Sequence, residues 1–101
     1  MNPKDPRITE YQNDLKEYEP WGKLFLIDSF GRYFYPNKPC NILMIHNGLE
    51  YCKAQLKLNT ITDTLHSDEE IKQRLVQIDE DIHKAEEVLL HDLSFRSLLL
   101  P

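Results

Sequence analysis

The stretch SDEEIKQRLVQIDEDIHKAEEVLLHD, residues 67–92, decides the fold. It opens with a capping box, in which the Ser67 hydroxyl accepts from the Glu70 N–H and the Glu70 side chain reaches back. Apolar residues then recur at spacings of 4, 3, 4, 3 and 4, the pattern of a helix with one buried seam. The residues of this seam are Ile71, Leu75, Ile78, Ile82, Ala85 and Leu89. We therefore expect a long helix from Asp68 to about Asp92.

A second apolar seam precedes this stretch and predicts a partner helix. Its residues are Ile42, Ile45, Leu49, Cys52 and Leu56, and Asn41 can cap the helix that carries them. A competing interpretation makes residues 42–46 a strand and residues 47–48 (Asn-Gly) a tight turn. We expect the continuous helix because the periodicity runs through the Asn-Gly pair. A loop near residues 59–66 would then join the two helices into an antiparallel hairpin.

The first third of the chain predicts a short helix followed by two strands. The Asp5-Pro6 pair is typical of a helix start, and Pro20 stops the helix. Residues 23–28 and 32–35 are short apolar or aromatic runs, which we expect to form a β-hairpin with Gly31 at positive φ in its turn.

These elements together predict an α+β, mostly helical fold. It has a short N-terminal helix, a two-stranded antiparallel β-hairpin, then an antiparallel helical hairpin with a long third helix. The 101 residues suffice for one small domain and are too few for two. Within residues 1–101 we distinguish an aromatic helix-plus-hairpin part over 1–36, the helical hairpin over 37–94 and an apolar tail over 95–101.

The charge is distributed unevenly and bears on the class of partner. The net charge is −5, and residues 62–94 hold three basic and ten acidic residues, a net charge of −7. An acidic surface repels phosphate backbones, so we expect no binding to duplex nucleic acid. The longest apolar runs have four residues, far short of the roughly 20 that a membrane-spanning helix needs.

Two cysteines, Cys40 and Cys52, are too few for a disulfide-stapled secreted domain of this size. Residues 1–6 also lack the apolar core of a secretory signal, although a signal already removed would leave no trace. We therefore expect free thiols and an intracellular, reducing compartment.

The sequence contains no motif that fixes a chemistry. Its histidines and cysteines are not at the close spacings of a structural zinc site, and its three glycines are too scattered to form a phosphate-binding loop. The carboxylates Asp79, Glu80, Asp81, Glu86 and Glu87 are expected on the outer, solvated face of the third helix. We expect no catalytic, cofactor-binding or metal-binding residues and no enzymatic activity.

The aromatic and apolar residues at the two ends favour a protein-interaction module. Eight of the ten aromatic residues lie between Tyr11 and Tyr35, and the tail carries Leu98-Leu99-Leu100. Aromatic residues are preferred anchors at interfaces, and a β-hairpin alone buries too little apolar surface. The expected partner-binding residues are Trp21, Phe30, Tyr33, Tyr35, Leu98 and Leu99.

The expected role is that of a small acidic subunit of a larger assembly, or of an inhibitor of another protein, with a partner whose surface is basic. Three alternatives remain open at this point. The acidic helix could mimic nucleic acid and block a nucleic-acid-binding protein. The helical seam could mediate self-association into a homo-oligomer. The apolar segments could also close on one another in a self-sufficient monomer.

Overall fold

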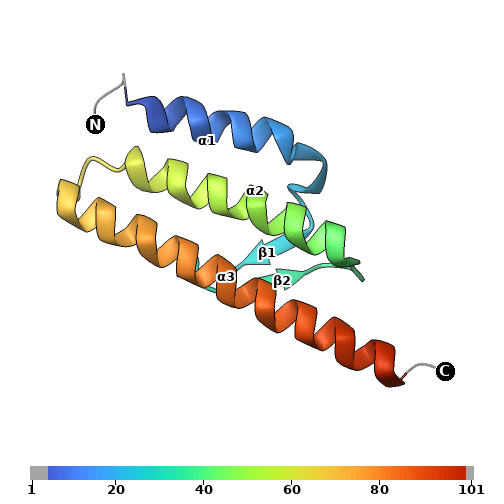
Figure 1. Ribbon diagram of the computed structural model, residues 1–101. Helices are drawn as coiled ribbons and strands as arrows, with labels where there is room; N and C mark the ends of the chain where they lie inside the picture. Colours follow the sequence, from blue (N-terminus) through green and yellow to red (C-terminus); the bar gives the residue numbers. More distant parts are fainter. Residues whose placement is uncertain (1–4, 100–101) are drawn as a thin grey trace.

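The expected fold class is confirmed by a computed structural model, which describes the backbone of residues 5–99 and the side chains of residues 5–93. A short helix, a β-hairpin and a pair of long antiparallel helices follow one another along the chain (Figure 1). The elements are α1 (Pro6–Glu17), the 3-10 helix η1 (Glu19–Trp21), β1 (Phe25–Ile27), β2 (Phe34–Pro36), α2 (Ile42–Ile61) and α3 (Asp68–Leu99).

Helix α2 is the central element, with α1 along one side and α3 along the other (Figure 1). Both neighbours need an apolar surface on α2, so its buried residues are not confined to one stripe. Ile45, Leu49 and Cys52 of the predicted seam are buried, and so is Ala54. Ile42 departs from the prediction and is 64% exposed, because it is the first residue of the helix and no preceding turn covers it.

The continuous α2 replaces the alternative of a strand and a tight turn at Asn47-Gly48. Asn41 caps the helix by accepting a hydrogen bond from the Met44 N–H at 2.9 Å. Gly48 lies directly beneath the hairpin, and a Cβ atom at this position would stand 2.5 Å from Cε2 of Phe25. The glycine therefore serves the close approach of the hairpin rather than a turn.

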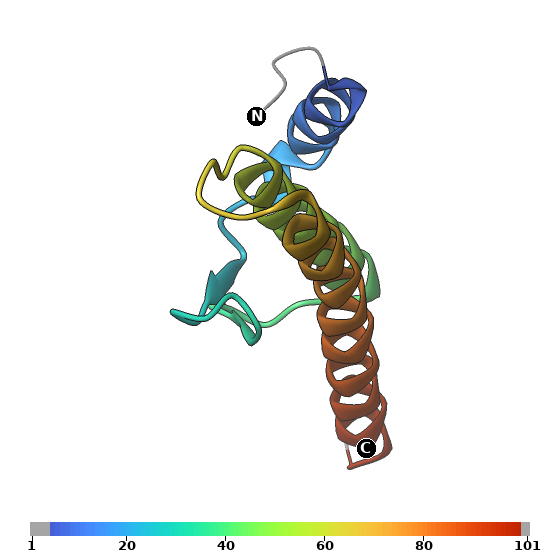
Figure 2. The same ribbon diagram turned by 90° about the vertical axis from the view of Figure 1, so that its left-hand side faces the viewer.

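Helix α3 runs past its expected end near Asp92 and continues to Leu99, so that boundary was wrong. The physical reason is that no proline or glycine interrupts residues 93–99, and the first helix-breaking residue is Pro101. The last turns of α3 project beyond the rest of the molecule (Figure 2). Within residues 5–99, no helix combines the length and the apolar character that crossing a membrane requires.

The β-hairpin packs one face on the helices. β1 and β2 are antiparallel, with Leu26 opposite Tyr35 and Ile27 opposite Phe34. Phe25 and Phe34 are buried in a core cluster with residues from both long helices. The helical members of that cluster are Ile45, Leu49, Cys52, Ile78 and Ile82. The hairpin is thus a cover over the α2–α3 seam.

Candidate interaction surface

The hairpin turn is built around the carboxylate of Asp28. Its Oδ1 accepts from the N–H groups of Arg32 at 2.7 Å and of Tyr33 at 2.8 Å, and Oδ2 accepts from the N–H of Phe30 at 3.3 Å. These hydrogen bonds lower the pKa of Asp28, and the one from the Tyr33 N–H contributes most. Gly31 adopts the predicted positive φ of 69°, a conformation that strains other residues. The turn is therefore fixed by its own local chemistry.

Two arginines and one aspartate tie this turn to α3. Arg74 Nη2 lies 3.5 Å from the carbonyl oxygen of Gly31, and its Nη1 lies 3.7 Å from Asp81 Oδ2. Arg32 Nε approaches the same carboxylate oxygen at 3.6 Å. The two distances to Asp81 Oδ2 exceed hydrogen-bonding range. This oxygen is buried and has no hydrogen-bond partner among the described residues. The turn is therefore attached to α3 by the hydrogen bond from Arg74 to Gly31 and by charge attraction at Asp81.

The outer face of the hairpin is apolar and exposed. Leu26 is 62% exposed, Phe30 77%, Tyr33 63% and Tyr35 55%. Leu26 and Tyr35 are cross-strand neighbours, and Phe30 and Tyr33 lie on the turn that joins the strands. We call these four residues the hairpin patch. Several exposed apolar side chains on one hairpin are typical of an interaction site.

A groove of about 450 Å³ lies between β2 and α3 and continues the hairpin patch toward the helix. Its apolar walls are Tyr33, Tyr35 and Pro36 from the hairpin and Ala85, Val88 and Leu89 from α3. Arg32 lines it on the hairpin side and Lys84 on the helix side, with Asp81 also in the lining. We call this feature the β2–α3 groove. It combines apolar walls with charged groups from both sides.

The structure separates the six predicted partner-binding residues. Phe30, Tyr33 and Tyr35 come together on the hairpin patch. Trp21 is half-buried and packs against the core cluster, in contrast to the three exposed aromatic residues. Leu98 and Leu99 belong to the backbone of α3, and their side chains lie outside the described residues.

The five carboxylates expected on the outer face of α3 are not all there. Asp81 faces the hairpin and its side chain is only 11% exposed, so its placement was wrong. The local reason is the pair of arginines that neutralise it. Three others contact a basic residue: Asp79 forms an ion pair with Lys57 at 2.6 Å, whereas Glu86 and Glu87 contact His46 at 3.2 Å and His83 at 3.0 Å, side chains that neutralise a carboxylate only when protonated. The negative charges of Asp79 and Asp81 are therefore matched within the molecule by Lys and Arg side chains.

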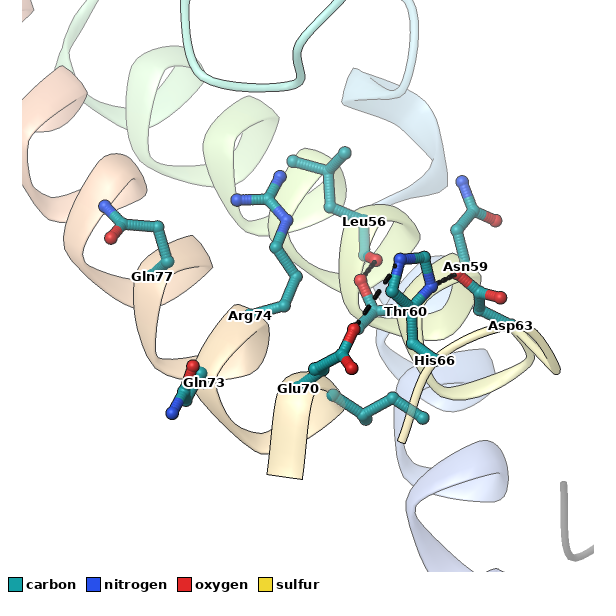
Figure 3. Close-up of a pocket in the computed structure, with 10 residues that line it drawn as sticks. Leu56, Asn59, Thr60, Asp63, His66, Glu70, Gln73, Arg74 and Gln77 are labelled. Carbon is teal, nitrogen blue, oxygen red and sulfur yellow. Dashed lines mark hydrogen bonds and ion pairs between the residues drawn. The ribbon is translucent and has the colours of Figure 1, made fainter. Parts of the chain in front are cut away.

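A larger, polar pocket of about 640 Å³ lies where the α2–α3 loop meets both helices (Figure 3). His66 Nδ1 lies 2.5 Å from Asp63 Oδ2, and its Nε2 lies 3.9 Å from Glu70 Oε2. The pKa of Asp63 is lowered by a hydrogen bond from the Leu65 N–H and by His66. The hydroxyl of Thr60, which lines the pocket, donates a hydrogen bond to the Leu56 carbonyl at 2.8 Å. The cluster thus organises the loop and contains no activated nucleophile.

The two cysteines are shielded by burial, and the metal-binding residue types within residues 5–93 are dispersed. Both cysteines are free, Cys52 being buried and Cys40 partly buried. Burial raises the pKa of the Cys52 thiol to about 12, which leaves it unreactive at neutral pH. In the part of the chain that the structure describes, no three His, Cys, Asp or Glu residues are grouped to hold a metal ion.

Comparisons with models of protein families, with curated proteins and with solved structures find no match to this chain. The site is therefore judged on its own geometry.

Sequence reasoning missed Leu26, Val88 and the flanking cations Arg32 and Lys84. Leu26 stands in an unbroken apolar run, Leu24 to Ile27, in which no polar alternation marks the exposed face. The exposure of Val88 could have been predicted, because this apolar residue does not belong to the buried 4-3-4 seam of α3.

Proposed function

We propose that this protein is a non-enzymatic protein-interaction module that docks through the hairpin patch. The observation that carries the proposal is the exposure of Leu26, Tyr33 and Tyr35 on one face of a hairpin whose other face is buried, together with the exposure of Phe30 on the adjoining turn. Burying exposed aromatic residues against a partner is a major source of binding energy at interfaces. The role fits a small subunit of a larger assembly or an inhibitor of another protein, and the free thiols are consistent with an intracellular, reducing compartment.

The acidic character of the chain favours a partner with a basic surface. The net charge is −5, and Glu80 of α3 is exposed without an ion pair among the described residues. Such charge accelerates encounter with a basic protein more than it strengthens the final complex. A nucleic-acid mimic receives less support, because Asp81 is turned inward and Asp79 is already paired with Lys57.

The test uses the full chain with two substitutions on the patch. The double variant Tyr33→Ser/Tyr35→Ser removes two exposed rings, and Leu65→Ser is the matched control, because Leu65 is 90% exposed in the distant α2–α3 loop. Proteins retained from an extract of the source cells are identified, purified and titrated against all three chains.

A partner should bind the double variant about 30-fold more weakly or worse, corresponding to about 2 kcal/mol for a central aromatic anchor. The control should bind within about twofold of the wild type, because surface substitutions away from an interface have small effects. Equal binding of every partner to all three chains would refute the proposal. So would a failure to recover any partner that binds as a purified protein.

A further inference from the structure

We propose that the β2–α3 groove receives an extended, acidic segment of a partner protein, which adds to the free edge of β2 and places a carboxylate between Arg32 and Lys84. The inference deepens the proposed function and rests on it, since it states what kind of segment the partner inserts beside the hairpin patch.

The hydrogen-bond phase of the hairpin establishes the free edge. The Asp28 N–H donates to the Tyr33 carbonyl at 3.1 Å, and the Asn37 N–H donates to the Leu24 carbonyl at 2.8 Å. In an antiparallel pair, hydrogen-bonded and non-hydrogen-bonded positions alternate. Phe34, opposite Ile27, therefore occupies a non-hydrogen-bonded position, and its N–H and C=O point away from β1.

This edge borders the groove. The groove lining includes all of β2, Phe34–Pro36, and residues of α3. A peptide that enters the groove in an extended conformation meets the free N–H and C=O of Phe34, as in the addition of a strand to an exposed edge. Pro36 has no N–H, so the ladder stays short and the affinity depends on side-chain contacts.

The charges at the groove select an acidic segment. Lys84 is exposed and has no ion pair among the described residues. Arg32 is about half exposed, and at 3.6 Å it makes no hydrogen bond to Asp81. Arg74 also neutralises Asp81, so the arginines and Lys84 outnumber the one carboxylate. A carboxylate that reaches both Arg32 and Lys84 gains charge-assisted hydrogen bonds, whereas a basic side chain meets repulsion.

The apolar walls of the groove determine which residues should flank the carboxylates of the partner segment. Tyr35 and Val88 face the groove from opposite sides and are both more than half exposed. In an extended peptide, alternate side chains point to opposite faces. A segment that alternates acidic residues with valine or tyrosine therefore has one apolar face, which can enter the groove between these walls, and one acidic face, which can meet the cations.

The experiment titrates the isotope-labelled full chain with a capped hexapeptide that alternates glutamate with valine and tyrosine, and follows backbone amide shifts by NMR. We expect saturable shifts at Phe34, Tyr35 and Val88. A peptide with lysine in place of glutamate should bind about tenfold more weakly or worse. A peptide N-methylated at its central amides should also lose about tenfold, because it cannot extend the ladder.

Two charge-reversal variants supply the matched control. Lys84→Glu should weaken the glutamate peptide about tenfold. Lys72→Glu changes an exposed lysine of the same helix away from the groove and should leave the affinity within about twofold.

Absence of saturable shifts would overturn the inference, as would equal binding of the glutamate and lysine peptides. Equal binding of dodecanoate and the glutamate peptide would show a site for amphiphilic anions and would also overturn it. If a partner requires Tyr33 and Tyr35 while the peptide fails to bind, the proposed function stands alone. If the peptide binds and no partner is recovered, the groove chemistry stands and the proposed function fails.

Discussion

The two faces of the β-hairpin carry similar residues in opposite surroundings. On the inner face, Phe25 and Phe34 are buried against the α2–α3 seam. On the outer face, Leu26 and Tyr35 are cross-strand neighbours and both are more than half exposed. An antiparallel ribbon with one solvated face normally alternates apolar with polar residues. This departure from the alternation is the reason why we propose that the outer face docks on a partner.

The largest expected effect separates the two faces by stability. Phe25→Ala should lower the free energy of unfolding by about 3–5 kcal/mol, because it leaves a cavity in the core cluster. Leu26→Ala, one residue along on the outer face, should change it by less than about 1 kcal/mol. Urea unfolding followed by circular dichroism measures both. Similar losses for the two variants would mean that the outer face is packed as well.

Cys52 reports on whether the inner face stays closed over the helices. At pH 8 its thiolate fraction should be about a thousandfold lower than that of an unperturbed thiol, since burial raises its pKa to about 12. Iodoacetamide should therefore modify Cys40 first and Cys52 only when the protein opens. Because burial raises the pKa of Cys52, the native state holds the thiol proton more tightly than the unfolded chain does. The contribution of the buried neutral thiol to protein stability is therefore complete below the ordinary thiol pKa and is lost as the pH rises toward 12. Equal alkylation rates at the two cysteines would contradict a closed inner face.

Gly48 tests how closely the inner face approaches α2. Gly48→Ala should destabilise the protein by about 1–3 kcal/mol through overpacking, although alanine favours an isolated helix by about 1 kcal/mol. The reason is the 2.5 Å that would separate the new Cβ from Phe25. Adding Phe25→Leu should restore part of the loss, which a double-mutant cycle measures. A stabilised Gly48→Ala protein would show that the hairpin stands farther from the helix.

The smallest effect concerns the turn that joins the two faces. The pKa of Asp28 lies below its ordinary value of 3.8, chiefly because the Tyr33 N–H donates to the carboxylate. A lowered native pKa means that the turn is stabilised above pH 3.8 and that this contribution is lost as the pH falls through the native pKa. The amide shifts of Arg32 and Tyr33 should follow that titration. In Asp28→Asn they should not change over the same range, and a titration that persists there would assign it to another group.

Much of the fold could be predicted from local patterns. The capping box at Ser67 and the seam of α3 fixed the start and the buried face of that helix, and Gly31 marked the hairpin turn. The end of α3 could not be placed, because no residue between Ser67 and Pro101 is a proline or a glycine. The role of Gly48 was ambiguous in the sequence. A glycine is needed there because Phe25, which is distant in the chain, packs closely against this position.

The surface was less predictable than the fold. Phe30, Tyr33 and Tyr35, which were predicted from aromatic content alone, are exposed, whereas Trp21 was predicted on the same basis and packs on the core. From the sequence alone, Asp81 is predicted to be a solvated carboxylate like its neighbours. Only the folded structure shows that the hairpin turn brings Arg32 beside it. Which face of a hairpin is covered depends on tertiary packing, and no local signal in an apolar run specifies it.

The most direct test of the docking claim compares tyrosine iodination of the isolated chain with that of the same protein in its native assembly. Peptide mapping would quantify labelling at Tyr33 and Tyr35, with buried Tyr11 as the internal control. We predict that Tyr33 and Tyr35 are labelled in the isolated chain and protected in an assembly larger than 12.0 kDa, while Tyr11 resists in both. Equal labelling of Tyr33 and Tyr35 in the two states, or elution of the native protein as a 12.0 kDa monomer, would contradict the account.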